Sequence, residues 1–157
     1  MSDKNNYELF LGTLLSVASK PQVCRMLEYT QHHGNAAYVH CFNVAVISYL
    51  IARHLHWKID EASLARGAML HDFHLYTRQD TNVSGFKHLL NHPKLALANA
   101  MHEFSLNEKE KNIIRSHMWP VTIFQLPKSK EAFLVTLADK YCAALEMAGR
   151  MHEKLPV

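Results

Sequence analysis

The sequence has few of the residues that define several classes of protein. Its 157 residues include only 5 glycines, 5 prolines and 3 cysteines, which excludes a collagen-like chain, a low-complexity chain and a disulfide scaffold. No apolar run reaches the roughly 18 residues that a membrane span requires, so we expect no membrane partner. Residues 1–6 lack the apolar stretch of a secretion signal. The cysteines lie in apolar stretches, which favours buried thiols and a cytoplasmic location.

The net charge of the chain is also small. Seventeen basic residues face 14 acidic ones, and the net charge of +3 does not indicate a nucleic-acid polymer as partner. Hydrophobic residues make up 48% of the chain and charged residues 20%, as in a folded globular domain. We therefore predict one domain over residues 1–157, whose oligomeric state the sequence leaves open. The unusual number is 12 histidines, which points to metal chemistry.

The hydrophobic periodicity is helical, and no stretch alternates convincingly with period two. The predicted fold class is therefore all-α, a compact single-domain bundle of about six or seven helices. Asp60 is a candidate N-cap, residues 107–110 resemble a capping box, and Pro93 suits a first helical turn. Residues 73–87 are predicted to be irregular. The expected helices cover about residues 7–20, 21–27, 36–57, 60–72, 92–104, 107–117 and 129–151.

Several ionisable residues occupy helical positions where apolar residues are expected. His40 begins a face that continues with Val44 and Ile47, and Asp139 follows the apolar run of residues 134–138. His71 and Asp72 end apolar stripes of their own helix. Four ionisable residues therefore occupy positions where apolar residues are expected. An unpaired buried carboxylate would cost several kcal/mol, so it needs a cation or strong hydrogen bonds. Imidazole and carboxylate ligands together suit Mn, Fe, Co, Ni or Zn.

The adjacent pair His71 and Asp72 is the most informative local feature. Neighbouring residues of a helix diverge by about 100°, so both side chains reach one point only near a helix end or where a site holds more than one ion. His92 and His117 lie at the predicted ends of two further helices. Two aspartates and four histidines would hold two ions and leave coordination positions for water and substrate.

These residues resemble the H…HD…D pattern of the HD-domain phosphohydrolase superfamily. The pattern is carried by His40, by His71-Asp72 after Arg66-Gly67-Ala68-Met69-Leu70, and by Leu137-Ala138-Asp139-Lys140. His92-Pro93 followed by Ala96, together with His117, resembles the additional histidines of the binuclear branch. The resemblance covers about residues 33–146, and the surrounding sequence is similar to a bacterial subgroup of this superfamily. It implies an all-α HD-like domain.

The resemblance also implies a ligand set and a reaction. It implies that one divalent ion is bound by His40, His71, Asp72 and Asp139, and a second by Asp72, His92 and His117. The candidate ions are Fe, Mn, Co, Ni and Zn, and Mg is a further candidate. Bound at Asp72 and the neighbouring ligands, they would activate a hydroxide for catalysis. The implied substrate is a phosphomonoester or phosphodiester of a small metabolite, with a nucleotide or dinucleotide as the expected class.

Further catalytic roles are predicted for residues near the ligands. Arg66, about one turn before the His-Asp pair, and Lys94, two residues after a ligand histidine, are candidate phosphate contacts. His33, His74 and His88 are candidate donors of a proton to the leaving oxygen, because an imidazole titrates near neutral pH. Lys140 ranks below them, because it should diverge by about 100° from the aspartate before it.

Two other functions are compatible with the same residues. Inositol-oxygenase-like enzymes share the HD fold and the two-Asp, four-His set, and hold a diiron centre that activates oxygen. A binding or sensing module could instead use the metal for its structure. The Asp72→Ala variant separates the last alternative from an enzyme, because a structural metal predicts unfolding, whereas an enzyme predicts a folded, metal-poor and inactive protein.

Overall fold

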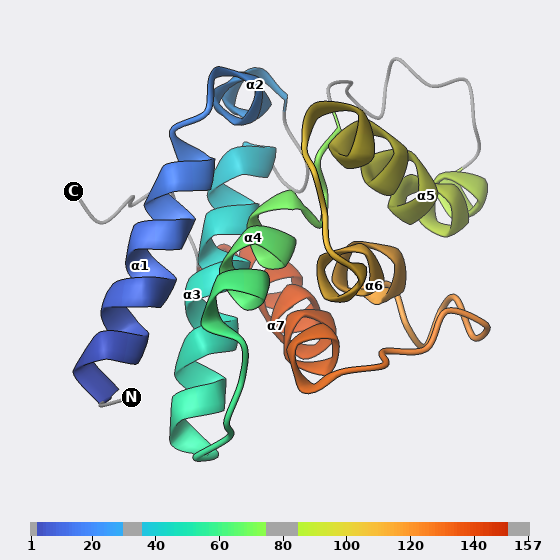
Figure 1. Cartoon of the computed structure of the whole chain (residues 1–157). Helices are drawn as coiled ribbons and strands as arrows, with labels where there is room; N and C mark the ends of the chain where they lie inside the picture. The colour runs from blue at the N-terminus through green and yellow to red at the C-terminus, as the bar shows by residue number, and fades with distance from the viewer. Residues whose placement is uncertain (1–2, 30–35, 75–84, 151–157) are drawn as a thin grey trace.

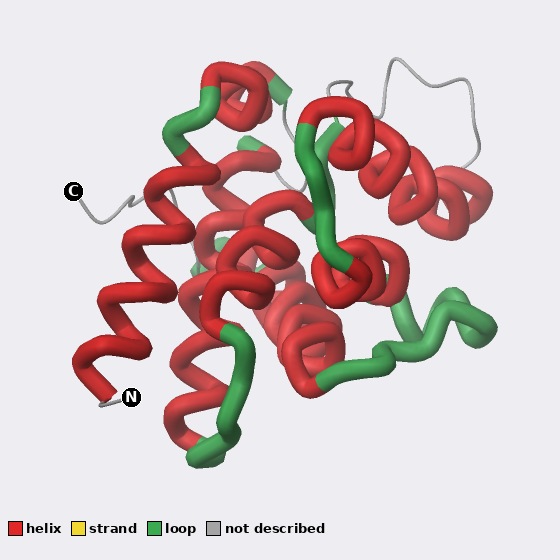
Figure 2. The backbone as a smooth tube through the Cα atoms, in the orientation of Figure 1, coloured by secondary structure: helices red, strands yellow, loops and turns green. Residues whose placement is uncertain are grey.

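The computed structural model describes residues 3–29, 36–74 and 85–150 (for residues 85–89, the backbone), and helices dominate this part (Figure 1, Figure 2). Its described residues form seven α-helices and one short 3-10 helix, with no strand. The elements are α1 (Asp3–Ala18), α2 (Pro21–Cys24), η1 (Arg25–Glu28), α3 (Ala37–His54), α4 (Glu61–Leu70), α5 (Gly85–Glu103), α6 (Glu108–Ser116) and α7 (Lys130–Met147). The predicted all-α fold is confirmed.

Helix α4 is the centre of the arrangement. It packs against α1 and α3 on one side and against α6 and α7 on the other. Figure 1 shows α1 and α3 side by side in blue and cyan, with α5 and α6 on the opposite side of the molecule. Helix α7 packs against α3 and α6, and α5 packs against α6. Helix α4 therefore contacts four of the other described helices.

The core is built from the apolar faces of these helices. Leu14 of α1, Leu64 of α4 and Leu134 of α7 have no exposed surface, and neither does Ile113 of α6. Each such leucine or isoleucine contributes about 1.5–3 kcal/mol when it is removed from water. These side chains form one continuous cluster, so the helices are held by packing rather than by isolated contacts. None of the described helices is both long and apolar enough to cross a membrane.

The predicted caps at two helix starts are confirmed. The side chain of Asp60 accepts a hydrogen bond from the backbone N–H of Ser63 (3.0 Å), at the start of α4. Asn107 and Glu110 form a reciprocal capping box at the start of α6, because each side chain accepts from the backbone N–H of the other. Both caps satisfy helix N–H groups that have no partner within the helix.

The start of α5 corrects the predicted boundary. The helix begins at Gly85 and contains Pro93 in its interior, whereas the sequence predicts a start near residue 92. The apolar sequence positions Phe86, Leu90, Pro93 and Ala96 continue the helical spacing through the proline. The spacing outweighs the loss of one backbone hydrogen bond that proline causes. Of the predicted irregular segment 73–87, residues 75–84 lie outside the described residues.

The end of α7 is a second correction. The helix ends at Met147, four residues before the predicted end, and Gly149 follows with φ of 65°. The N–H groups of Gly149 and Arg150 donate to the carbonyl oxygens of Glu146 (3.0 Å) and Leu145 (2.9 Å). This is a Schellman motif, which favours glycine because the left-handed conformation penalises a side chain.

A close approach of α4 and α6 sets the distance between their C-terminal ends. A Cβ atom added to Gly67 of α4 would lie 2.5 Å from Cδ1 of Ile113 and 3.0 Å from its Cβ. Only glycine therefore permits this packing distance. Because His71 follows α4 and His117 follows α6, the same contact brings two sequence-predicted ligands toward each other.

Candidate metal centre

Five elements supply the six residues that the sequence predicts as metal ligands. Each is buried, with an exposed fraction of at most 8%. Two of them are the C-cap residues of α4 and α6, where the chain leaves the helix and a side chain can turn inward. The six are His40 on α3, His71 and Asp72 at the end of α4, His92 on α5, His117 at the end of α6 and Asp139 on α7.

The structure brings these residues into two groups that share one carboxylate. His40, His71, Asp72 and Asp139 each offer a ligand atom, and these atoms all lie within 4.8 Å of one another. Asp72, His92 and His117 meet the same criterion. The two groups have the membership that the family resemblance implies. They could hold two ions, with Asp72 between them.

Backbone carbonyls orient two of the imidazoles. Nδ1 of His71 donates to the carbonyl oxygen of Ala68 at 2.7 Å, and Nδ1 of His117 donates to that of Ile114 at 2.8 Å. A carbonyl oxygen can only accept, so each Nδ1 carries the proton. The Nε2 atom of each ring then points to the interior, where it can offer a lone pair to a metal ion once the ring is neutral.

The first group shows a mismatch that a cation would resolve. Nε2 of His71 is buried and makes no hydrogen bond. It lies 3.4 Å from Oδ2 of Asp72 and 3.6 Å from Oδ1 of Asp139. Burial alone would lower the pKa of His71, but Cys41, Asp72 and Asp139 raise it well above its usual value, so the site favours a positive charge at this point. Once the ring is neutral, these three atoms are all electron donors, and a divalent ion between them could supply that charge by coordination. The residues present therefore fit a metal ion.

The second group has the same character. Nε2 of His92 and Nε2 of His117 are 2.8 Å apart, and each is 3.3 Å from Oδ1 of Asp72. Because Nδ1 of His117 holds that ring's proton, its Nε2 faces the group as an acceptor. Two ring nitrogens and a carboxylate oxygen thus converge on one point, which suits a transition-metal ion.

The pKa shifts show how strongly the buried carboxylates depend on positive charge. Burial alone would raise the pKa of Asp72, but the charge of nearby histidines, of which His71 has the largest effect, holds it well below its usual value. Burial alone would also raise the pKa of Asp139, but its hydrogen bond with His40 and the nearby charge of His71 hold it below its usual value. Both carboxylates are therefore ionised at neutral pH, as metal ligands must be.

The histidine pKa values diverge according to their partners. Burial alone would lower the pKa of His40, but hydrogen bonds with Asp139 and Glu146 outweigh it and raise the pKa to about 10. Burial lowers the pKa of His92 to about 4, and the charge of Asp72 only partly opposes this. His92 is thus a neutral ligand at physiological pH.

Glu146 is a member of the site that the sequence reasoning missed. Its side chain has no exposed surface, and its two carboxylate oxygens lie 3.0 and 3.2 Å from Nδ1 of His40. It follows Asp139 by seven residues, or two helical turns, and so lies on the same face of α7. A glutamate at this spacing from a ligand aspartate was the signal in the sequence.

Lys140 also lies closer to the site than predicted. Its Nζ donates to the carbonyl oxygen of His117 at 2.8 Å and lies 3.9 Å from Oδ2 of Asp139. Burial lowers its pKa, while the charges of Asp139 and Asp72 act in the opposite direction. The side chain bends back toward the ligands although the Cα direction differs, because a long flexible stem can cover that angle.

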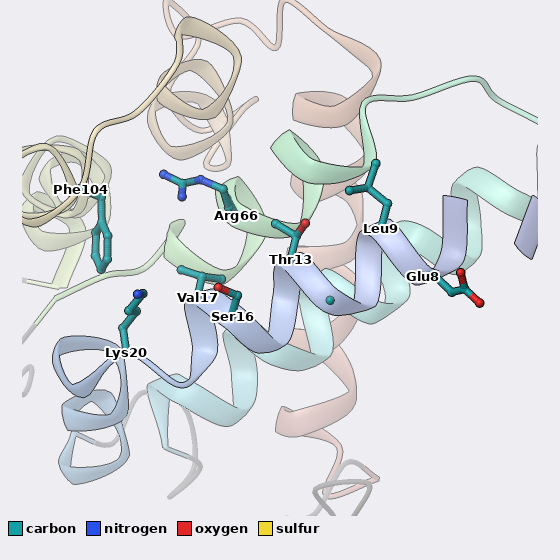
Figure 3. A pocket seen from close by; sticks show the side chains of 9 residues that line it. Glu8, Leu9, Thr13, Ser16, Val17, Lys20, Arg66 and Phe104 are labelled. Atoms are coloured by element: carbon teal, nitrogen blue, oxygen red, sulfur yellow. The ribbon is translucent and has the colours of Figure 1, made fainter. Parts of the chain in front are cut away.

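The structure does not bring Arg66 to the ligand set. Its Nε donates to Oε1 of Glu110 at 2.8 Å, and its terminal nitrogen donates to the carbonyl oxygen of Ser105 at 2.8 Å. Figure 3 shows the side chain at a separate pocket of about 320 Å³, lined also by Lys20 and Phe104. None of the six ligand residues lines that pocket. The guanidinium is therefore engaged in joining α4 to α6.

The other predicted catalytic residues are placed as follows. Lys94 is exposed on α5, and two residues along a helix its side chain diverges by about 200° from that of His92. His74 is 5% exposed, and its backbone N–H donates to the carbonyl oxygen of Asp72 at 2.7 Å. His33 and the side chain of His88 lie outside the described residues. The catalytic roles of these four residues stay predictions.

The comparison with protein families agrees with this geometry. Residues 37–144 match the HD domain, and this match spans more than half of the chain. The protein belongs to the HD-domain family, which consists largely of metal-dependent phosphohydrolases. Neither a curated protein nor a solved structure matches the chain.

Proposed function

We propose that the protein is a metal-dependent phosphohydrolase that cleaves a phosphomonoester or phosphodiester of a small metabolite. A nucleotide or dinucleotide is the substrate class we favour, because the resemblance to the HD superfamily implies it. The net charge of +3 supports a small substrate over a nucleic-acid polymer. The proposed cofactor is a pair of divalent ions, with Fe, Mn, Co, Ni, Zn and Mg as the candidates.

The observation that carries the proposal is the position of Asp72 between the two groups. Its Oδ2 lies 3.4 Å from Nε2 of His71, and its Oδ1 lies 3.3 Å from Nε2 of both His92 and His117. One carboxylate oxygen is therefore available to each group. A carboxylate shared in this way is typical of two-metal hydrolytic sites.

The bound ions would supply a hydroxide nucleophile at neutral pH and act as Lewis acids on the phosphate oxygens. The described residues provide the conditions for this chemistry. Backbone carbonyls hold the rings of His71 and His117 with Nε2 inward. All six ligand residues are buried, which excludes bulk water and strengthens each electrostatic interaction.

Among the residues that the structure describes, Lys140 is the cation best placed to contact a phosphate. Its Nζ lies 3.9 Å from Oδ2 of Asp139 and is anchored to the carbonyl oxygen of His117. A positive charge at this position would oppose the charge that develops on the equatorial phosphate oxygens. His74, buried two residues after Asp72, is the described candidate for protonating the leaving oxygen.

The experiment is hydrolysis of a chromogenic phosphomonoester and a chromogenic phosphodiester by protein loaded with each of the six metals. We expect turnover that requires metal and falls at least 100-fold in Asp72→Asn, with the ester preference defining the next substrates. Glu108→Gln is the matched control, because this carboxylate pairs with Lys111 on the surface. It should retain the activity of the wild type.

Two results would overturn the proposal. The first is an absence of hydrolysis of either ester, and of a panel of nucleotides, by protein whose metal content has been measured and is complete. The second is oxygen consumption by the iron-loaded protein without ester hydrolysis, which would favour the diiron oxygenase alternative. Unfolding of Asp72→Asn, by contrast, would favour a structural metal and a binding or sensing module.

A further inference from the structure

Glu146 gives one ligand of the centre a support that the other oriented histidines lack. Both of its carboxylate oxygens face Nδ1 of His40, at 3.0 and 3.2 Å, and the side chain is completely buried. The Nδ1 atoms of His71 and His117 face uncharged backbone carbonyls instead. A buried carboxylate is costly to retain unless it is paired, so its placement behind a ligand calls for a function.

We propose that Glu146 is a positioning residue that makes the four-ligand group the tight metal site, so that the two ions bind in order. The first ion enters the group of His40, His71, Asp72 and Asp139. The second enters the group of Asp72, His92 and His117 with lower affinity. This inference rests on the proposed metal-dependent function, since it assumes that both groups bind ions.

The first part of the argument concerns the orientation of His40. A carboxylate accepts hydrogen bonds and cannot donate them, so Glu146 fixes the proton of His40 on Nδ1. Nε2, which lies 3.1 Å from Oδ1 of Asp139, then becomes the ligand atom. A carboxylate behind a ligand imidazole also makes that imidazole a stronger electron donor, and loss of such a partner lowers metal affinity about 10–100-fold.

The second part concerns the distribution of negative charge. The four-ligand group contains Asp72 and Asp139, and Glu146 contacts it from behind. The three-ligand group contains only Asp72, which both groups share. A first divalent ion therefore meets two carboxylates in the four-ligand group and a third behind His40. A second ion finds one carboxylate whose charge the first has already partly neutralised, which weakens its attraction.

The test is titration of metal-free protein with Zn²⁺ or Mn²⁺ in competition with a chromophoric chelator, so that binding is measured without activity. We expect two classes of site, each with one ion per chain. Glu146→Gln should weaken the tight class about 10–100-fold and leave the weak class within a few-fold of its original affinity. His92→Ala should abolish the weak class and retain one tight ion.

Glu131→Gln is the matched control for the loss of a buried carboxylate. Glu131 lies on the same helix and is 4% exposed, but its partners are Asp60 and Lys109 rather than a ligand histidine. This variant should change stability without changing the affinity of either class. Circular dichroism of each variant shows whether it is folded. If Glu146→Gln does not fold, the His92→Ala titration still tests the order of binding.

The inference is overturned if the two ions bind with equal affinity, if Glu146→Gln weakens both classes equally or neither, or if His92→Ala removes the tight class. These outcomes differ from failure of the proposed function. Ordered binding without ester hydrolysis would reject only the phosphohydrolase. Hydrolysis with unaltered binding in Glu146→Gln would reject only the role of Glu146.

Discussion

The ammonium group of Lys140 on α7 donates a hydrogen bond to the backbone carbonyl oxygen of His117, 2.8 Å away, at the end of α6. This contact joins a cation to the backbone of a candidate metal ligand. His117 is the C-cap residue of its helix, where carbonyl groups lack a partner within the helix. Lys140 therefore has two functions to test, satisfying the helix end and contacting substrate.

Replacement of Lys140 by methionine separates these functions. We expect kcat to fall about 10–100-fold because the phosphate loses a stabilising cation, while the affinity for metal stays within a few-fold. Lys58→Met, an exposed lysine between α3 and α4, should behave as the wild type. Steady-state kinetics and a metal titration check this. Equal activity of Lys140→Met and the control would assign the phosphate contact to another cation, with Lys94→Met as the next variant.

The Gly67→Ala variant tests the close approach of α4 and α6. The new Cβ would lie 2.5 Å from Cδ1 and 3.0 Å from Cγ2 of Ile113, so the helices must separate. We expect a loss of about 1–3 kcal/mol in the free energy of unfolding, measured by urea denaturation. Gly12→Ala is the matched control on α1. No heavy atom lies within 4 Å of its added Cβ, so it should stabilise the protein by about 0.5–1 kcal/mol.

The second readout for Gly67→Ala is metal affinity. Separation of α4 from α6 would move His117 away from the His71-Asp72 pair, so the weaker metal class should lose affinity. A smaller side chain in Ile113→Val, combined with Gly67→Ala, should recover part of the stability. A Gly67→Ala protein as stable as the wild type would show that the contact between Gly67 and Ile113 does not limit how closely α4 and α6 pack.

The cap at the start of α4 predicts a pH-dependent stability. Burial raises the pKa of Asp60, but hydrogen bonds from Ser63 and Lys109 outweigh it, so the folded-state pKa lies below the unfolded value. The charged form therefore stabilises the fold above the unfolded pKa of about 4, and this stabilisation is lost as pH falls through the lower, folded value.

The Asp60→Asn variant retains a capping side chain and removes the charge. We expect its melting temperature to lie below that of the wild type at pH 6–7 and to converge with it near pH 3, when both proteins are studied without metal. Asp3→Asn, which removes an 81%-exposed carboxylate side chain paired with Arg53, controls for the change in net charge. A difference that grows as the pH falls would contradict the prediction.

Removal of the metal tests whether the ion is structural. The core has many fully buried apolar side chains, so the protein treated with a chelator should remain helical and cooperative. Metal at 100 times its dissociation constant should add about 2.7 kcal/mol, which raises the melting temperature by roughly 5–10 °C for a chain of this size. Asp72→Asn should show little of this shift. Loss of helical structure on chelation would indicate a structural metal.

The ligand set could be predicted because its members break a helical pattern. His40, His71 and Asp139 are polar residues at positions that apolar periodicity reserves for the core. The adjacency of His71 and Asp72 indicated either a helix end or more than one ion. The structure shows the helix end, since His71 is the C-cap of α4, and Asp72 belongs to both groups of candidate ligands.

The contacts of long side chains could not be predicted in this way. The direction of the Cα–Cβ bond places Lys140 away from Asp139, yet the flexible stem returns its Nζ to within 3.9 Å of that carboxylate. Arg66 was predicted at the phosphate from its spacing, but it pairs with Glu110 because α6 packs against α4. Such contacts depend on tertiary packing, which periodicity does not contain.

The fold was predictable as a set of helices but not at each boundary. The capping chemistry of Asp60 and Asn107 fixed two starts correctly. At α5 the sequence offered two conflicting signals, the spacing of apolar residues and Pro93. The helix continues through Pro93 because the helical spacing of apolar residues on both sides of it outweighs one missing hydrogen bond.

The pairing of His40 with Asp139 joins residues 99 positions apart along the chain. Closing a loop of that length costs about 4 kcal/mol of chain entropy, which only the packed helices between the two residues can repay. During synthesis on a ribosome, the four-ligand group therefore cannot form until α7 has emerged. A nascent chain that still lacks α7 has no complete four-ligand group, so under the proposed order of binding the first ion can enter only after α7 has joined the other helices.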